Sequence, residues 1–167
     1  PKCPWVFARS PDGKTLAALP SSFDLSASNA DRPGTMLILD TQTLETTREI
    51  DGIPQGQKSL AFSPDGARIA TGGADGIVSL FAADTGRLLS ATSNQGMVVF
   101  SISFSPDGTY VIFAFQDIRL GGESPTNLYF LPADTLSQTR ILEPMPLPEG
   151  FFTRTDAPVP ALRPAKP

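Results

Sequence analysis

The tetrapeptide Ser-Pro-Asp-Gly occurs three times in this chain, beginning at Ser10, Ser63 and Ser105, so the copies are 53 and 42 residues apart. The dipeptide Asp-Thr follows each copy, at residues 40–41, 84–85 and 134–135. Two landmarks that recur in the same order at a similar spacing indicate an internal structural repeat. The chain is therefore expected to fold as a series of three like units.

Each Ser-Pro-Asp-Gly copy has the composition of a tight turn between two strands. Serine accepts hydrogen bonds at the turn entry, proline sets φ, aspartate bonds to its own backbone, and glycine takes the left-handed position. The predicted turn residues are Ser10, Pro11, Asp12 and Gly13, then Ser63, Pro64, Asp65 and Gly66, then Ser105, Pro106, Asp107 and Gly108, with Asp75 and Gly76 as a further hairpin turn. Because the turn explains each aspartate completely, we do not interpret these acids as catalytic.

The segments around the turns have the pattern of β-strands. Val98, Phe100, Ile102 and Phe104 alternate with neighbours that are mostly serine, which predicts a strand with one apolar face. Residues 110–115 are apolar on both faces and predict a strand that is covered from both sides. No segment shows a helical period, so the chain is predicted to be all-β.

The expected strands fall into three groups of four. They are Trp5 to Arg9, Thr15 to Leu19, Thr35 to Leu39 and Thr46 to Ile50; Lys58 to Phe62, Ala67 to Thr71, Ile77 to Phe81 and Arg87 to Thr92; and Val98 to Phe104, Tyr110 to Phe115, Asn127 to Leu131 and Gln138 to Leu142. The grouping predicts three antiparallel β-propeller blades, at about residues 4–52, 57–94 and 97–142. Residues 143–167 are rich in proline and are expected to form a tail or linker.

The second unit resembles one blade of a WD-repeat β-propeller. The resemblance is carried by the run from Ala61 to Gly72, which contains Ser-Pro-Asp-Gly, and continues to the run from Asp84 to Leu89. Across the chain it covers about residues 4–142. It implies a propeller whose surface binds proteins or peptides, without identifying a partner.

Several residues depart from the WD pattern. Phe81-Ala82 stands where the Trp-Asp pair would fall, and the chain contains no histidine. The polar tetrad of the family is therefore reduced to Thr71 and Asp75. Arg9 holds the place that phenylalanine holds in the other units, which predicts either a face that no neighbouring blade covers or an ion pair inside a closed ring.

Three blades are too few for a closed ring, which typically has four to eight. We expect an incomplete ring, with further blades supplied by a longer chain or by another copy, and we favour a fragment of a larger propeller. The sequence starts without methionine or a signal-peptide apolar region, so we expect it to be processed or excised.

Two long connections, at residues 20–34 and 116–125, are either partner-binding loops or tolerated insertions. Phe151-Phe152 is expected to dock on an uncovered blade face or on a partner, because adjacent aromatic side chains are costly to leave in water. The candidate contact residues are Phe23, Asp31, Arg32, Arg119, Phe151 and Phe152. Asp24, Asn29 and Asp31 lack the spacing of a calcium loop, so no metal site is predicted.

Composition argues against several classes of function. The net charge is −4 and the basic residues are scattered, which argues against nucleic-acid binding. Cys3 is the only cysteine, so an internal disulfide and a cysteine-rich zinc site are excluded while the compartment stays open. No apolar run reaches the roughly 18–20 residues of a membrane span.

The predicted function is a non-enzymatic protein-interaction or scaffold module. There is no histidine, no second cysteine, no Gly-rich phosphate loop and no serine nucleophile elbow, so neither catalysis nor a cofactor is predicted. The alternative is a fragment of a propeller enzyme or sensor domain that binds a small ligand at the central channel. An acidic cluster at the channel would favour this alternative, whereas an apolar or aromatic patch would favour the interaction module.

Overall fold

All regular structure in the part of the chain described is β. The computed structural model describes residues 5–20, 34–54, 56–93, 97–117 and 127–134. The strands are β1 Trp5–Arg9, β2 Thr15–Pro20, β3 Gly34–Asp40, β4 Thr46–Ile53, β5 Gln57–Phe62, β6 Arg68–Gly73, β7 Ile77–Ala82, β8 Leu88–Ser93, β9 Met97–Phe104, β10 Tyr110–Asp117 and β11 Asn127–Pro132. No helix that is long and apolar enough to cross a membrane occurs in these ranges.

The strands form three separate antiparallel sheets. Their orders are β1-β2-β3-β4, β5-β6-β7-β8 and β11-β10-β9, and we name them blade 1, blade 2 and blade 3. The all-β prediction of four-stranded antiparallel units is confirmed in the first two blades. The predicted fourth strand of the third unit, at residues 138–142, lies outside the described residues.

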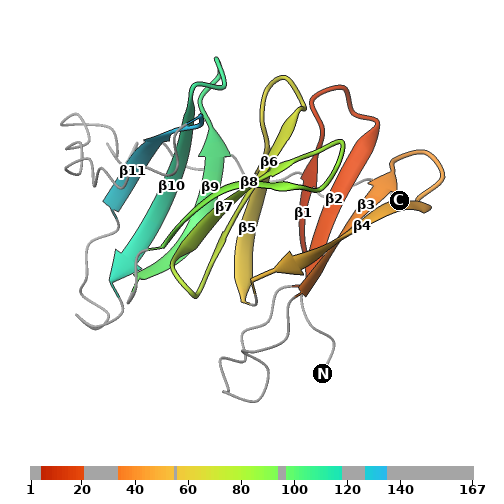
Figure 1. The fold of residues 1–167 in the computed structure, drawn as a ribbon. Coiled ribbons are helices and arrows are strands. Elements are labelled where there is room, and N and C mark those ends of the chain that lie inside the picture. The colour runs from red at the N-terminus through yellow and green to blue at the C-terminus, as the bar shows by residue number, and fades with distance from the viewer. Residues whose placement is uncertain (1–4, 21–33, 55, 94–96, 118–126, 135–167) are drawn as a thin grey trace, which may run out of the picture.

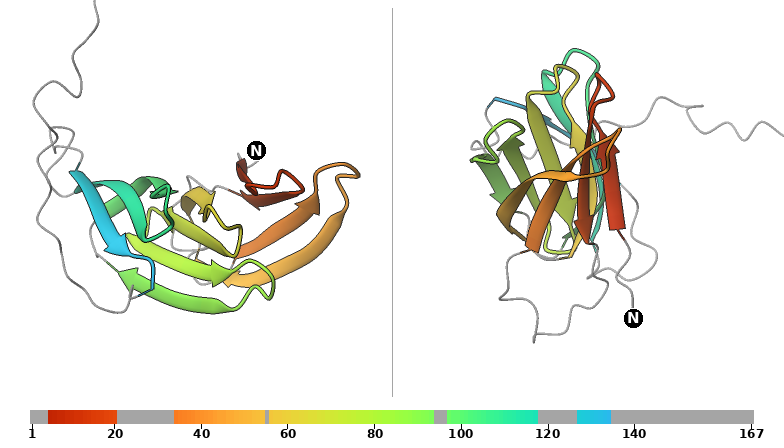
Figure 2. Two further views of the ribbon diagram at one scale, coloured as in Figure 1. Left: turned by 90° about the horizontal axis from the view of Figure 1, so that it is seen from above. Right: turned by 90° about the vertical axis from the view of Figure 1, so that its right-hand side faces the viewer.

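The three blades stand face to face along an arc (Figure 1). Strands β1, β5 and β9 lie on the concave side, and β4 and β8 lie on the convex side (Figure 2). Contacts run directly between β1 and β5 and between β5 and β9. The backbone amide of Ile102 in β9 donates to the hydroxyl of Ser59 in β5 at 3.0 Å, which joins two edge strands of different sheets.

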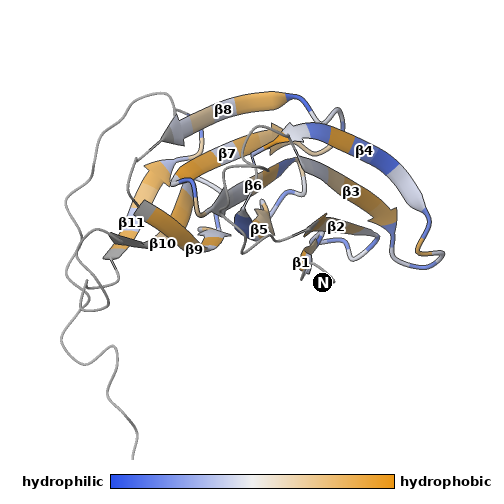
Figure 3. Cartoon of the chain, turned by 90° about the horizontal axis from the view of Figure 1, so that it is seen from below, coloured by the Kyte–Doolittle hydropathy of each residue, from blue (hydrophilic) through white to orange (hydrophobic). Residues whose placement is uncertain are grey.

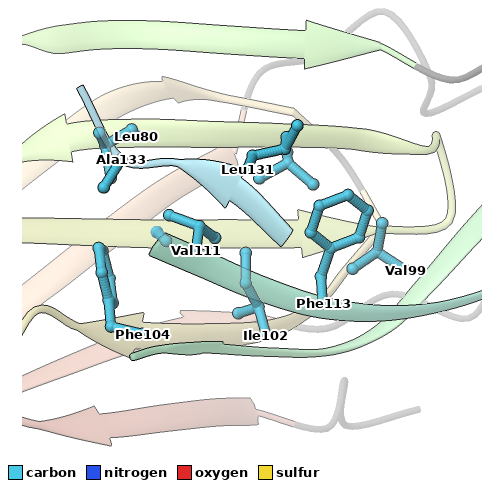
Figure 4. Close-up of a cluster of buried hydrophobic side chains, with 10 residues drawn as sticks. Leu80, Val99, Ile102, Phe104, Val111, Phe113, Leu131 and Ala133 are labelled. Atoms are coloured by element: carbon cyan, nitrogen blue, oxygen red, sulfur yellow. The ribbon is translucent and has the colours of Figure 1, made fainter. Parts of the chain in front are cut away.

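The hydrophobic core lies between the blades, and each interface holds one cluster. Buried residues between blades 1 and 2 are Ala17, Leu19, Met36, Ile38, Ile50, Ile53, Leu60, Ile69 and Phe81. Those between blades 2 and 3 are Ala70, Val78, Leu80, Val99, Ile102, Phe104, Val111, Phe113, Leu131 and Ala133 (Figure 4). Apolar residues follow most strands, whereas β4 carries a hydrophilic stretch on the convex side (Figure 3). Burial of these sheet faces is what stabilises the stack.

The predicted apolar face of the strand before the third turn is wrong at Phe100. Ser101 pairs with Ala114 and Val99 pairs with Phe115, so Phe100 is the extra residue of a β-bulge. A bulge reverses the alternation of side chains on one side of it. As a result Val99 is buried and Phe100 is 47% exposed.

Two expectations about β10 also need correction. Tyr110 is 43% exposed, and Ile112 and Ala114 are half-buried, so the strand is not covered on both sides as predicted. The reason is that only blade 2 packs on blade 3 among the described residues. The strand also continues through Gln116 and Asp117, which pair with β9, so the predicted loop does not begin at residue 116.

Candidate binding surface

The three Ser-Pro-Asp-Gly segments form closely similar turns at one edge of the stack. The glycine amide donates to the serine carbonyl at 2.9, 2.8 and 2.9 Å in Gly13, Gly66 and Gly108, respectively. The three glycines have φ of 74°, 70° and 71°, in the left-handed region. Each serine hydroxyl donates to the aspartate carboxylate two residues on and accepts the amide five residues on, from Thr15, Arg68 and Tyr110.

These hydrogen bonds keep the turn aspartates ionised. The serine hydroxyl, followed by the Lys14 amide in the first turn and the Ala67 amide in the second, lowers the pKa of Asp12 and of Asp65. In the third turn the hydroxyl of Ser105 and then the Thr109 amide lower the pKa of Asp107 to about 2. Donors to a carboxylate favour its charged form. Each turn therefore carries one negative charge that is fixed in place by hydrogen bonds.

The turns of successive blades touch one another. A side chain built at Gly66 would begin 3.7 Å from Cδ of Pro11, and one at Gly108 would begin 3.5 Å from Cδ of Pro64. The segments after the third strands lie beside them, because the amides of Ala83 and Ala133 donate to the carbonyls of residues 67 and 109. We call this edge, formed by residues 10–15, 63–68, 83–84, 105–110 and 133–134, the turn rim.

A cavity of about 510 Å³ opens at the turn rim between blades 1 and 2. We call it the first groove. Its lining includes Thr15 from blade 1 and Phe62, Gly66 and Ala83 from blade 2. Three carboxylates, those of Asp12, Asp65 and Asp84, also line it, together with the cationic Arg48. The first groove is therefore a polar cleft of net negative charge with an aromatic ring in its wall.

A second cavity of about 410 Å³ occupies the corresponding place between blades 2 and 3. We call it the second groove. It is lined by Arg68 from blade 2 and by blade 3 residues that include Gly108, Tyr110, Ala133 and Asp134. The two grooves repeat one arrangement along the rim.

The second hairpin turn lies between β6 and β7, at Asp75 and Gly76. The Ile77 amide donates to the Asp75 carboxylate at 3.0 Å, and Gly76 has φ of 71°. Partial burial raises the pKa of Asp75 above its usual value. Thr71 and Asp75, the two residues that remain of the family's polar tetrad, are not joined by a hydrogen bond, because the buried Thr71 hydroxyl has no hydrogen-bond partner within the described residues.

Gln57 is a buried polar residue that the sequence reading missed. Its side chain is 1% exposed and lies beside the Asp75 carboxylate, whose pKa it lowers against the effect of burial, although its amide atoms make no hydrogen bond of normal geometry within the described ranges. In the sequence Gln57 stands next to Lys58 at the polar start of its strand, and periodicity does not distinguish such a glutamine from a surface residue.

The outer face of blade 1 carries exposed aromatic side chains. Trp5 is 46% exposed and Phe7 is 58% exposed, and Arg9 lies on the same face of β1. Counted back from the turn serine, Phe7 corresponds to Leu60 in blade 2 and Ile102 in blade 3, which are 6% exposed because the preceding blade covers them. We call this uncovered surface the open face.

The predicted contact residues Phe23, Asp31, Arg32, Arg119, Phe151 and Phe152 lie outside the described residues. So do Asp24 and Asn29 and the proline-rich segment 143–167. Within the described ranges, no group of three or more His, Cys, Asp or Glu residues is arranged to hold a metal ion.

Comparison with known protein families gives a match that covers parts of blades 1 and 2. Residues 46–81 match the family described as "WD domain, G-beta repeat". The matched segment runs from β4 of blade 1 through β5, β6 and β7 of blade 2, so the sequence repeat is offset from the sheet by one strand.

Two curated relatives are WD-repeat proteins. WD repeat-containing protein SL1-17 of Schistosoma mansoni is 28% identical over 108 residues, which are 65% of this chain and 36% of that protein. WD repeat-containing protein VIP3 of Arabidopsis thaliana is 39% identical over 56 residues, which are 34% of this chain and 17% of that protein. The chain thus spans about a third or less of either relative's length. The matches and the stacked antiparallel sheets together support a WD-repeat-like protein whose sheets are consistent with an incomplete β-propeller.

Proposed function

We propose that this chain is a non-enzymatic protein-interaction or scaffold module. The observation that supports the proposal most directly is the open face of blade 1, where Trp5 and Phe7 are about half exposed. Adjacent aromatic side chains on a flat sheet face are typical of surfaces that another protein covers. The WD-repeat relatives point to the same general role.

The corresponding positions in the other blades indicate what kind of surface covers the open face. Leu60 and Ile102 are each buried by a preceding blade. A further blade, from the same longer chain or from another copy, would bury Phe7 in the same way. The turn rim would stay free for partner proteins, because it lies at the edge of the sheets and not on their faces.

The alternative of a small-ligand enzyme or sensor gains less support. The turn aspartates lie on successive blades and are held by serine hydroxyls and backbone amides. Their lowered pKa values make them poor general acids near neutral pH. The exposed aromatic patch is the feature that favours a protein partner over a small ligand.

Site-specific photo-crosslinking tests the interaction proposal. A photoreactive phenylalanine analogue is placed at position 7 of the open face and, separately, at the exposed position 84 of the turn rim in the full chain. Position 88 in β8, where the leucine is 52% exposed, serves as the matched control on the convex side. Adducts formed in cells are identified by mass spectrometry.

We expect position 7 to crosslink to a blade-type segment and position 84 to crosslink to a different protein, both in higher yield than position 88. If neither test position gives an intermolecular adduct above the control, the chain is not an interaction module.

A further inference from the structure

The second groove holds an arginine side chain of this chain itself. Arg68 projects from blade 2, and its Nη2 donates to the carbonyl of Gly108 at 3.1 Å. Its Nη1 donates to the carbonyl of Ala133 at 3.3 Å. The guanidinium carbon lies 5.8 Å from the ring centroid of Phe104. Two carbonyls and one aromatic ring on blade 3 thus form a receptor for a guanidinium group.

The repeat places an equivalent aromatic ring and two equivalent carbonyl groups in the first groove. Phe62 and Phe104 each precede the turn serine, and Gly66 and Gly108 each end a turn. Ala83 and Ala133 are equivalent because each donates its amide to the carbonyl four residues after the turn serine. Blade 2 therefore offers the first groove the ring of Phe62 and the carbonyls of Gly66 and Ala83.

The residue that fills the receptor is different in the two grooves. The amides of Thr15 and Arg68 both donate to the turn serine hydroxyl five residues earlier, at 2.9 Å, so these two residues are equivalent. Threonine is too short to reach the carbonyls of the next blade. The cavity of about 510 Å³ lies at this position.

Arg48 occupies one part of the receptor. Its Nη1 donates to the Ala83 carbonyl at 2.9 Å, and its side chain is exposed. This bond comes from β4 on the convex side. The Gly66 carbonyl and the Phe62 ring are equivalent to the groups that Arg68 contacts in the second groove, and they lie in the groove lining with the carboxylates of Asp12 and Asp65.

We propose that the first groove binds an arginine side chain of a partner protein, whose guanidinium stacks on Phe62, donates to the Gly66 carbonyl and faces the carboxylates of Asp12 and Asp65. This inference rests on the proposed interaction function and names the partner chemistry at the turn rim. The planar guanidinium fits because it combines ring stacking with several directed donors, which a lysine ammonium does not.

Nuclear magnetic resonance of the isotope-labelled full chain tests the proposal. The probes are a blocked Gly-Arg-Gly peptide and the same peptide with citrulline or lysine in place of arginine. We expect the arginine peptide to shift the amide signals of Asp65 and Gly66, while the equivalent signals of Asp107 and Gly108 stay in place because Arg68 already occupies the carbonyls of Gly108 and Ala133. Citrulline and lysine peptides are expected to bind at least tenfold more weakly.

Two substitutions exchange the residues at the equivalent positions 15 and 68, so that each groove receives the residue of the other. Thr15→Arg supplies the first groove with the residue that occupies the receptor in the second, so it is expected to weaken peptide binding at least tenfold, whereas Leu88→Arg, which adds the same side chain on the convex side, leaves binding unchanged. Arg68→Thr frees the carbonyls of Gly108 and Ala133 in the second groove and is expected to create a second site that is reported by Asp107 and Gly108. The dispersion of the remaining amide signals shows that each variant is folded.

The arginine proposal is overturned if the Gly66 signal does not move, if citrulline or lysine binds as well as arginine, or if Thr15→Arg binds as well as the parent. The result is separable from the interaction function. Intermolecular crosslinks from position 7 or 84 together with a negative peptide titration would remove only the arginine assignment, whereas the absence of such crosslinks would remove the interaction function itself.

Discussion

Glycine and aspartate at the Ser-Pro-Asp-Gly turns have separate physical roles. Gly66 has φ of 70°, where an L-residue places its Cβ close to the following carbonyl oxygen at a cost of about 1–2 kcal/mol. The nearest atom to a built side chain is 3.7 Å away, which is ordinary contact. Backbone conformation, and not lack of space, therefore determines the residue at this position.

We expect Gly66→Val to lower the free energy of unfolding by about 2 kcal/mol, because a β-branched side chain is poorly tolerated at positive φ. Gly66→Asn is the matched control and is expected to lose less than about 1 kcal/mol, since asparagine adopts this conformation more readily. Urea titration of both variants measures the difference. Equal midpoints for Gly66→Val and the parent would contradict the role of the glycine.

Asp107 makes the stability of the chain depend on pH in a defined acid range. Its pKa is lowered from 3.8 to about 2 in the folded chain, so its carboxylate stabilises the fold above pH 3.8 and this contribution is lost as the pH falls towards 2. Asp107→Asn is expected to flatten the decline in thermal midpoint between pH 4 and about 2. Burial raises the pKa of Asp75, so its contribution to stability changes with pH in the opposite direction. Asp75→Asn is therefore not expected to flatten this decline. An unchanged acid slope in Asp107→Asn would contradict the turn hydrogen bonds.

At the level of elements, the close approach of blades 2 and 3 depends on one small residue. A Cβ at Gly72 in β6 would lie 2.6 Å from Cγ1 of Val99 in β9. Val99 reaches this position because the bulge at Phe100 turns it into the interface. The bulge and the glycine are thus two parts of one packing arrangement between sheets.

Gly72→Ala is expected to destabilise the chain by about 1–3 kcal/mol through overpacking, and Val99→Ala by about 2 kcal/mol through lost burial. The double variant is expected to lose at least about 1 kcal/mol less than the sum, because the smaller side chain at position 99 makes room for the alanine at position 72. Gly72→Ala combined with Ile53→Val, in the other core cluster, is the additive control. Denaturant unfolding of all variants measures these free energies. If the effects of Gly72→Ala and Val99→Ala are additive, the contact between positions 72 and 99 is disproved.

For the whole molecule, the number of blades determines which apolar residues are buried. Phe7 is 58% exposed, whereas its equivalent Leu60 is 6% exposed between blades 1 and 2. The two positions have the same place in the repeat. Their difference in burial comes from the neighbouring blade alone.

Phe7→Ser is expected to change the free energy of unfolding of the 167-residue chain by no more than about 0.5 kcal/mol, whereas Leu60→Ser costs about 3 kcal/mol or more. Phe7→Ser is also expected to reduce any rise of solution mass with concentration, because it removes apolar area from the open face. Light scattering and urea unfolding of the same preparations measure both effects. A large loss of stability from Phe7→Ser alone would mean that the open face is covered within the chain.

The repeat, the turns and most strands were predictable because they depend on neighbours close in sequence. Ser-Pro-Asp-Gly contains all the donors and the glycine that its turn needs, and strand alternation follows from the two-residue period of the backbone. Every described strand was predicted to within about three residues of its bounds, and the all-β class followed from the absence of a helical period.

Tertiary structure alone decided the exposure of Phe100, the fit of Val99 over Gly72, and the two grooves. Each depends on atoms from separate sheets, so no pattern within one strand reveals it. Arg68 and Thr15 illustrate the difference, since each follows a Ser-Pro-Asp-Gly turn, yet Arg68 bonds to carbonyls of the next blade and Thr15 is too short to do so. Local hydrogen bonding determines the blade, and the stacking of one blade on the next determines which of its surfaces are free to bind.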